Sequence, residues 1–95
     1  MRILKIYKDN CVPCHMLTFL LDDLSISVDN LEATAETVEK YSLKSVPVLL
    51  FLDDYDNVVD RILGLPTKQL LVRKLEENGY GHSILPKSGS EQESS

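Results

Sequence analysis

The sequence predicts one α/β domain in which three helices cover both faces of a four-stranded mixed sheet. Three observations lead to this fold class. Apolar residues recur with strand and helix periods in the order β-α-β-α-β-β-α. The two βα units predict parallel strands that are joined by right-handed crossovers. A length of 95 residues provides for one domain and no more.

The first strand and the first helix are predicted between residues 2 and 24. Residues 2–8 are rich in β-forming side chains and contain neither Gly nor Pro, which indicates a strand. Asp9 and Asn10 interrupt this pattern and can cap a helix. Residues 11–24 carry leucines at the i, i+3, i+4, i+7 spacing of an amphipathic helix. The side chains that we expect it to bury are Leu17, Phe19, Leu20, Leu21 and Leu24.

The second βα unit is shorter than the first. Residues 25–29 alternate polar and apolar side chains, which is typical of a half-buried strand. Residues 32–41 fit a helix that would turn Ala35, Val38 and Tyr41 toward the core.

The remaining elements are a hairpin and a last helix. Residues 46–52 are a continuous apolar run, which indicates a buried strand, and residues 58–63 return from an acidic turn as its antiparallel partner. Residues 67–78 carry leucines at helical spacing after Pro66, which suits a first helical turn. Gly79 is a typical helix stop.

The composition changes near the C-terminus. Residues 86–95 are small and polar and offer no side chain to a core. We therefore place the domain at residues 1–85 and interpret residues 86–95 as a flexible polar tail.

Charge and cysteine content exclude several classes of protein. Fifteen acidic and ten basic residues give a net charge of −5, which disfavours nucleic-acid binding because phosphate contacts need Lys and Arg. No apolar run reaches the roughly 18 residues of a membrane span, and the N-terminus lacks the pattern of a secretory signal. Two cysteines are too few for a disulfide-stapled secreted fold. We expect a cytoplasmic monomer without nucleic-acid or membrane partners.

The two cysteines carry the most specific chemical signal. Cys11-Val12-Pro13-Cys14 stands where the first strand meets the first helix. Unpaired N–H groups and the helix dipole favour a thiolate at this position, and a thiolate is the nucleophile of thiol–disulfide exchange. Cys11 would attack a substrate disulfide, and Cys14 would resolve the mixed disulfide. Pro13 in the first turn costs no helix hydrogen bond.

Two questions stay open at this point. The cysteines could instead be half of a zinc site or inert core residues, although His15 and His82 are the only histidines left as further ligands. Pro47 within an apolar strand is unusual, since it donates no ladder hydrogen bond. It could open the strand after a cis bond or end a loop after a trans bond.

Three motifs in order resemble the thioredoxin superfamily. They are the Cys-Val-Pro-Cys segment, the stretch from Tyr41 to Phe51 that contains Val46-Pro47, and Leu63-Gly64-Leu65. The resemblance spans about residues 2–78 and implies a thioredoxin-like fold with a cis bond before Pro47. It also implies that Cys11 and Cys14 are catalytic. The substrate-binding residues that it implies are Val12, Pro13, Val46, Pro47 and Gly64.

The resemblance implies a reductase of protein disulfides that receives electrons from a flavoprotein reductase and holds no cofactor of its own. The alternatives are a glutathione-dependent glutaredoxin, a hydrogen donor of ribonucleotide reductase, and a redox-inactive binding module. The region after Leu63 lacks the Gly-Gly…Asp pattern of glutathione-binding glutaredoxins. Lys5 occupies the position of the buried Asp that shuttles a proton in thioredoxin, so it could stabilise a thiolate without acting as an equivalent base. Lys8, three residues before Cys11, could also favour its thiolate.

Overall fold

The computed structural model describes residues 1–85 and confirms the predicted fold class. The sheet has the strand order β2-β1-β3-β4. Strand β1 pairs in parallel with β2, whereas the β1–β3 and β3–β4 pairs are antiparallel. The first βα unit thus has the predicted parallel strands, but the prediction for the second unit was wrong, because β3 pairs with β1 in the antiparallel direction and so also runs opposite to β2. The elements are β1 (Arg2–Tyr7), α1 (Val12–Asp23), β2 (Asp29–Glu32), α2 (Ala35–Tyr41), β3 (Val48–Leu52), β4 (Val58–Leu63), α3 (Lys68–Glu77) and a 3₁₀ turn (Gly81–Ser83).

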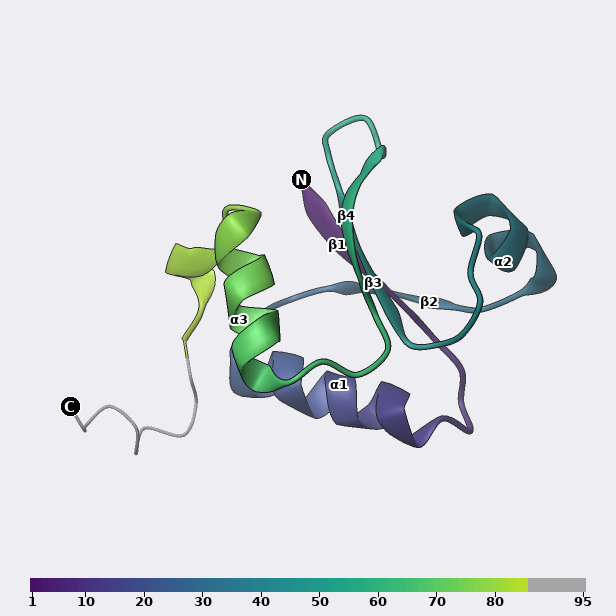
Figure 1. Ribbon diagram of the computed structural model, residues 1–95, viewed down its shortest axis with the longest axis horizontal. Coiled ribbons are helices and arrows are strands. Elements are labelled where there is room, and N and C mark those ends of the chain that lie inside the picture. The colour runs from purple at the N-terminus through teal and green to yellow at the C-terminus, as the bar shows by residue number, and fades with distance from the viewer. Residues whose placement is uncertain (86–95) are drawn as a thin grey trace.

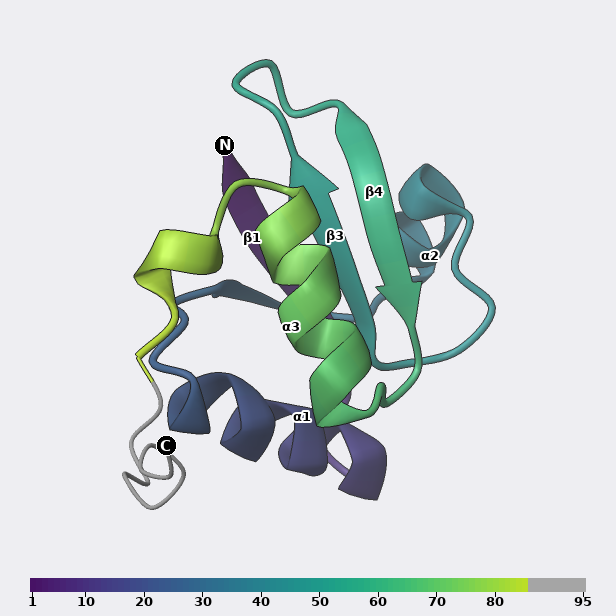
Figure 2. The same ribbon diagram turned by 60° about the vertical axis from the view of Figure 1, so that its left-hand side comes forward.

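The helices divide between the two faces of the sheet, as predicted. Helices α1 and α3 lie on one face and α2 lies on the other (Figures 1 and 2). No helix within residues 1–85 is long and apolar enough to cross a membrane. The predicted tail, residues 86–95, lies outside the described residues.

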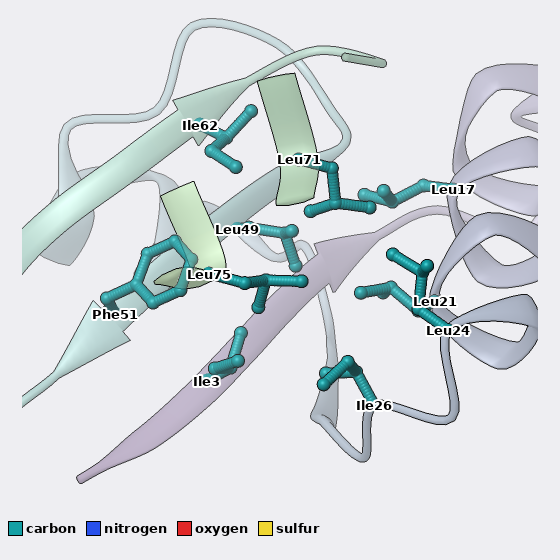
Figure 3. Packing of buried hydrophobic residues seen from close by; sticks show 10 residues of the cluster. All are labelled: Ile3, Leu17, Leu21, Leu24, Ile26, Leu49, Phe51, Ile62, Leu71 and Leu75. Carbon is teal, nitrogen blue, oxygen red and sulfur yellow. The ribbon is translucent and has the colours of Figure 1, made fainter. Parts of the chain in front are cut away.

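Two apolar clusters fill the spaces between the sheet and its helices. The larger cluster joins α1 and α3 to the sheet and contains ten buried side chains (Figure 3). The smaller cluster lies on the α2 face. The members of the larger one are Ile3, Leu17, Leu21, Leu24, Ile26, Leu49, Phe51, Ile62, Leu71 and Leu75. The members of the smaller one are Leu4, Ile6, Leu43, Val48, Leu50 and Leu52.

The strand register brings three loops to one end of the sheet. Ile6 near the end of β1 pairs with Val48 at the start of β3, and Val48 pairs with Leu63 at the end of β4. The segments that follow β1, precede β3 and follow β4 therefore leave the sheet at the same end. These segments contain the start of α1, Pro47 and Gly64.

The prediction of a strand at residues 25–29 was wrong, because β2 begins only at Asp29. Residue Ser25 has a φ of 59°, and Ile26 N–H donates to the carbonyl of Leu21 at 3.0 Å. These features form a left-handed helix exit of the Schellman type. Ile26 is buried and Val28 half-buried through packing against the core, without any ladder pairing.

The second helix starts later than predicted and buries less than predicted. Helix α2 begins at Ala35 after Thr34, which accepts a hydrogen bond from Thr37 N–H and forms a capping box with that residue. It contains no buried residue, and Val38 is 40% exposed. Among the residues of α2, only Tyr41 packs against the smaller cluster. The helix thus covers its face mainly through its flanking residues.

The prediction that α1 buries Phe19 was also wrong, because this side chain is 69% exposed. Leu17 and Leu21 are buried on the opposite side of the helix. Two residues correspond to about 200° of helical rotation, so Phe19 faces away from Leu17. The end of α3 agrees with its prediction, since Gly79 follows the helix with a φ of 88°.

Candidate redox site at the start of helix α1

Both cysteines are positioned by the start of α1. Cys11 is the N-cap residue, with extended backbone angles, and its Sγ accepts a hydrogen bond from Cys14 N–H at 3.1 Å. Pro13 lies in the first helical turn, as predicted. A sulfur at an N-cap receives the unpaired N–H groups and the positive end of the helix dipole. This arrangement favours a thiolate on Cys11 when the pair is reduced.

Cys11 and Cys14 form a disulfide whose Cα atoms are 5.2 Å apart. The two residues differ in accessibility. Cys14 is 2% exposed, whereas Cys11 is only partly buried. Val12 and Pro13 between them are exposed, Val12 to 73%. An incoming disulfide therefore has access to Cys11 and to this apolar surface before it can contact Cys14.

The segment before β3 confirms the expected cis peptide bond between Val46 and Pro47. Pro47 is buried and Val46 is half-buried. Gly64 N–H donates to the carbonyl of Pro47 at 2.9 Å, which ties the segment after β4 to the one before β3. Gly64 has a φ of 77°, a value that favours glycine, and a Cβ built there would meet no atom within 4 Å.

The structure thus gathers the predicted site residues into two groups. Cys11, Val12, Pro13 and Cys14 form the start of α1, and Val46, Pro47 and Gly64 form the two segments joined by the Gly64–Pro47 hydrogen bond. The strand register places both groups at the same end of the sheet.

Cys14 lines a cavity of about 340 Å³. Lys5, Thr18 and Asn30 line it, together with Cys14. Lys5 is 5% exposed, and this burial lowers the pKa of its ammonium group. Thr18 and Asn30 had no sequence signal of their own, because they come from α1 and β2 and meet only in the fold.

The two remaining basic candidates have different surroundings. Lys8 is exposed at the rim of this cavity. His15 Nε2 donates to the carbonyl of Asp9 at 3.0 Å, so its ring is held against the loop that precedes α1. Within residues 1–85, no group of three or more His, Cys, Asp or Glu side chains is arranged to hold a metal ion.

Comparisons with known proteins show which proteins this chain resembles. No protein-family model matches the chain. The chain is 29% identical over 72 residues to the SPbeta prophage-derived thioredoxin-like protein YosR of Bacillus subtilis, a match that covers 74% of this chain and 90% of that protein. It is also 29% identical over 83 residues to thioredoxin of Chlamydia caviae, which covers 80% of each chain.

Solved structures with the same fold include oxidised thioredoxin of Plasmodium falciparum, with a TM-score of 0.66 and 20% identity over 79% of this chain and 77% of that one. NrdH-redoxin of Escherichia coli, a glutaredoxin-like protein, gives a TM-score of 0.59 with 17% identity over 77% of this chain and 93% of that one. At these identities the structures establish the fold, which is thioredoxin-like.

The fold and the sequence relatives together support a dithiol oxidoreductase of the thioredoxin superfamily, in agreement with the resemblance seen in the sequence. The thioredoxin relatives indicate more particularly a thiol–disulfide oxidoreductase with a redox-active Cys pair.

Proposed function

We propose that the protein reduces disulfides of other proteins through the Cys11–Cys14 pair. The observation that carries this proposal is the asymmetry of the pair: Cys11 is partly exposed at the helix N-cap, and Cys14 is buried behind it. Thioredoxin-like proteins act on protein disulfides, and the relatives named above support the same substrate class for this chain.

The reaction proceeds in two exchanges. The Cys11 thiolate attacks one sulfur of the substrate disulfide, which forms a mixed disulfide and releases the other substrate sulfur as a thiolate. The Cys14 thiol then loses its proton and attacks Cys11 Sγ. The Cys11–Cys14 disulfide forms, and the second substrate sulfur leaves and takes up a proton. The substrate gains two electrons and the protein loses two.

We assign substrate contact to the residues around the pair. Val12 and Pro13 offer exposed apolar surface beside Cys11. The half-buried Val46 before Pro47 supplies backbone groups, and the open space at Gly64 leaves room for a substrate main chain. Pairing of extended backbones gives affinity with little demand on substrate side chains. A monomer in the cytoplasm that holds no cofactor of its own would suffice for this activity.

The electron donor in this proposal is an NADPH-dependent flavoprotein reductase. The segment Leu63-Gly64-Leu65-Pro66-Thr67 lacks the second Gly and the acidic residue that mark glutathione-binding glutaredoxins. NrdH-redoxin is described as a glutaredoxin-like protein with a thioredoxin-like activity profile. That description supports a thioredoxin-type activity for this chain. The flavoprotein donor and ribonucleotide reductase as a candidate acceptor follow from the resemblance in the sequence.

Two coupled assays test the proposal. Insulin is supplied as the disulfide substrate, and NADPH oxidation is followed with either thioredoxin reductase or glutathione plus glutathione reductase. We expect turnover in the first system and little in the second. Turnover only with glutathione would replace the proposal by a glutaredoxin function, and turnover in neither would support a redox-inactive binding module.

The roles of the two cysteines are tested separately with a matched pair of variants. We expect Cys14→Ser to accumulate a mixed disulfide with the substrate through Cys11, because nothing resolves it. Cys11→Ser should trap no substrate, because the buried Cys14 is out of reach. Trapping by Cys11→Ser instead of Cys14→Ser would reverse the assignment.

A further inference from the structure

A buried cation lines the same cavity as Cys14. Lys5 is the only buried charged or polar residue among residues 1–85, and its partner is a neutral hydroxyl. Its Nζ donates to Thr18 Oγ1, and the Thr18 hydroxyl donates to the carbonyl of Cys14 at 3.2 Å. This chain of hydrogen bonds connects β1 with the first turns of α1 and fixes Lys5 relative to Cys14.

Lys5 and Cys14 also line the same cavity. Its other titratable groups are Tyr7 and Lys8 from β1 and the loop after it, and His15 from α1. The Lys5 ammonium lies 5.7 Å from the centre of the Tyr7 ring. Asp22 of α1 lines a second cavity that Lys5 also reaches. These are the groups that face Lys5 from the elements packed against it.

The location of this charge is costly unless it stabilises an opposite charge. Burial of an ammonium group opposes its charged form, and burial of a thiol likewise opposes the thiolate. No carboxylate among residues 1–85 lines the cavity that Lys5 shares with Cys14. The buried charge in this cavity is the cation Lys5, so the lining supplies no carboxylate that could accept the proton of Cys14.

We propose that the Lys5 ammonium stabilises the Cys14 thiolate electrostatically, so that this buried thiol ionises without a neighbouring base. The proposal rests on the assignment of Cys14 as the resolving thiol. In the mixed disulfide, Cys14 releases its proton to water in the cavity, and its thiolate attacks Cys11 Sγ. The Cys11–Cys14 bond forms, the bond from Cys11 to the substrate breaks, and the leaving substrate thiolate takes up a proton. Lys5 keeps its proton throughout, and its positive charge stabilises the negative charge on Cys14 without taking part in the exchange.

The test measures the pKa of Cys14 as the only thiol of the molecule. In the Cys11→Ser background the thiolate absorbance in the ultraviolet is followed against pH, and the Cys11→Ser/Cys14→Ser double variant gives the tyrosine baseline. An opposite charge at short range lowers a pKa by about 1–3, so Lys5→Met should raise the Cys14 pKa by at least about 1. Lys5→Arg, which keeps the charge, should leave it within a few tenths.

Lys8→Met is the matched control, because it removes an exposed cation from the rim of the same cavity. It should change the Cys14 pKa by much less than Lys5→Met, since water screens an exposed charge. An unchanged Cys14 pKa in Lys5→Met would overturn the proposal, as would equal shifts in Lys5→Met and Lys8→Met. If Lys5→Met fails to fold, Lys5→Gln provides a neutral side chain that can still bond to Thr18.

The reduction potential gives a second readout that a merely structural role would not change. With both cysteines present, and at a pH above the measured Cys14 pKa, loss of a tenfold stabilisation of the Cys14 thiolate lowers the potential by about 30 mV. The Lys5→Met protein should therefore be the stronger reductant at that pH. An unchanged potential at that pH would contradict the proposal. The Cys14 titration needs no substrate, so it can succeed where insulin reduction fails and thereby separates this inference from the proposed function.

Discussion

The attachment of α1 to the sheet should depend on Leu17, which follows Cys14 by three residues on the same helix. Its side chain is fully buried in the larger core cluster, beside Leu21 and Leu71 from the two helices of that face (Figure 3). Phe19, two residues further on, is 69% exposed. The pair Leu17→Ala and Phe19→Ala therefore compares a buried and an exposed truncation on one helix.

The expected magnitude follows from the burial. Leu17→Ala removes three carbon atoms from a site with no exposure, and at about 0.8 kcal/mol for each the transfer loss is about 2.4 kcal/mol. The cavity that remains adds to this loss, so the total should be about 3–4 kcal/mol. Exposed substitutions away from special features stay within about 0.5 kcal/mol, which is the expectation for Phe19→Ala.

Urea unfolding of the two variants and the unsubstituted protein, all in the disulfide form, measures these differences in free energy. A small domain has a total stability of about 5–15 kcal/mol, so Leu17→Ala should remove a large part of it. Equal losses in the two variants, or a larger loss in Phe19→Ala, would refute the assignment of the buried face of α1.

Three further predictions follow from the structure. A side-chain hydrogen bond from Asn78, with the Lys74 ammonium beside it, lowers the pKa of Asp60. The free energy of unfolding that Asp60 contributes is present above about 4, the pKa of an unfolded Asp, and is lost as pH falls through the lower folded pKa. In acid unfolding, the Asp60→Asn protein should not show this loss of stability. Thr34→Ala removes the cap of α2 and should lower the free energy of unfolding in urea by about 1 kcal/mol. A loss near zero would contradict a stabilising role of the capping box. Gly79→Ala should cost about 1–2 kcal/mol because of the φ of 88°, and a stabilised variant would contradict this.

The fold could be predicted where side-chain pattern and backbone structure coincide. The leucine spacing of residues 11–24 located α1, and the apolar run before the acidic turn located β3. The pattern failed at β2, because the inward-facing Ile26 and Val28 alternate with the exposed Ser25 and Ser27 as they would in a strand. These residues belong instead to the segment in which the chain is still leaving α1. The edge strand that follows has mostly exposed side chains, so it pairs through its backbone without an apolar signal.

Some features of the site could likewise be predicted from the sequence, and others could not. The Cys pair at the start of α1 and the cis bond before Pro47 agree with expectations from motif and resemblance. The partner of Lys5 could not be predicted, because Thr18 is thirteen residues away and reaches it only when α1 packs on the sheet. The exposure of Phe19 could not be read from its apolar character alone, because its direction around the helix decides it.

The two-electron reduction potential of the Cys11–Cys14 pair tests the central claim most directly. The protein is equilibrated with defined thiol–disulfide buffers, and Cys14→Ser, which cannot form the internal disulfide, is the control. We predict a potential near the roughly −270 mV of thioredoxin, as a reductase of protein disulfides requires. A potential near about −120 mV, typical of a strong oxidant, or the absence of an internal disulfide at any buffer ratio, would contradict the account.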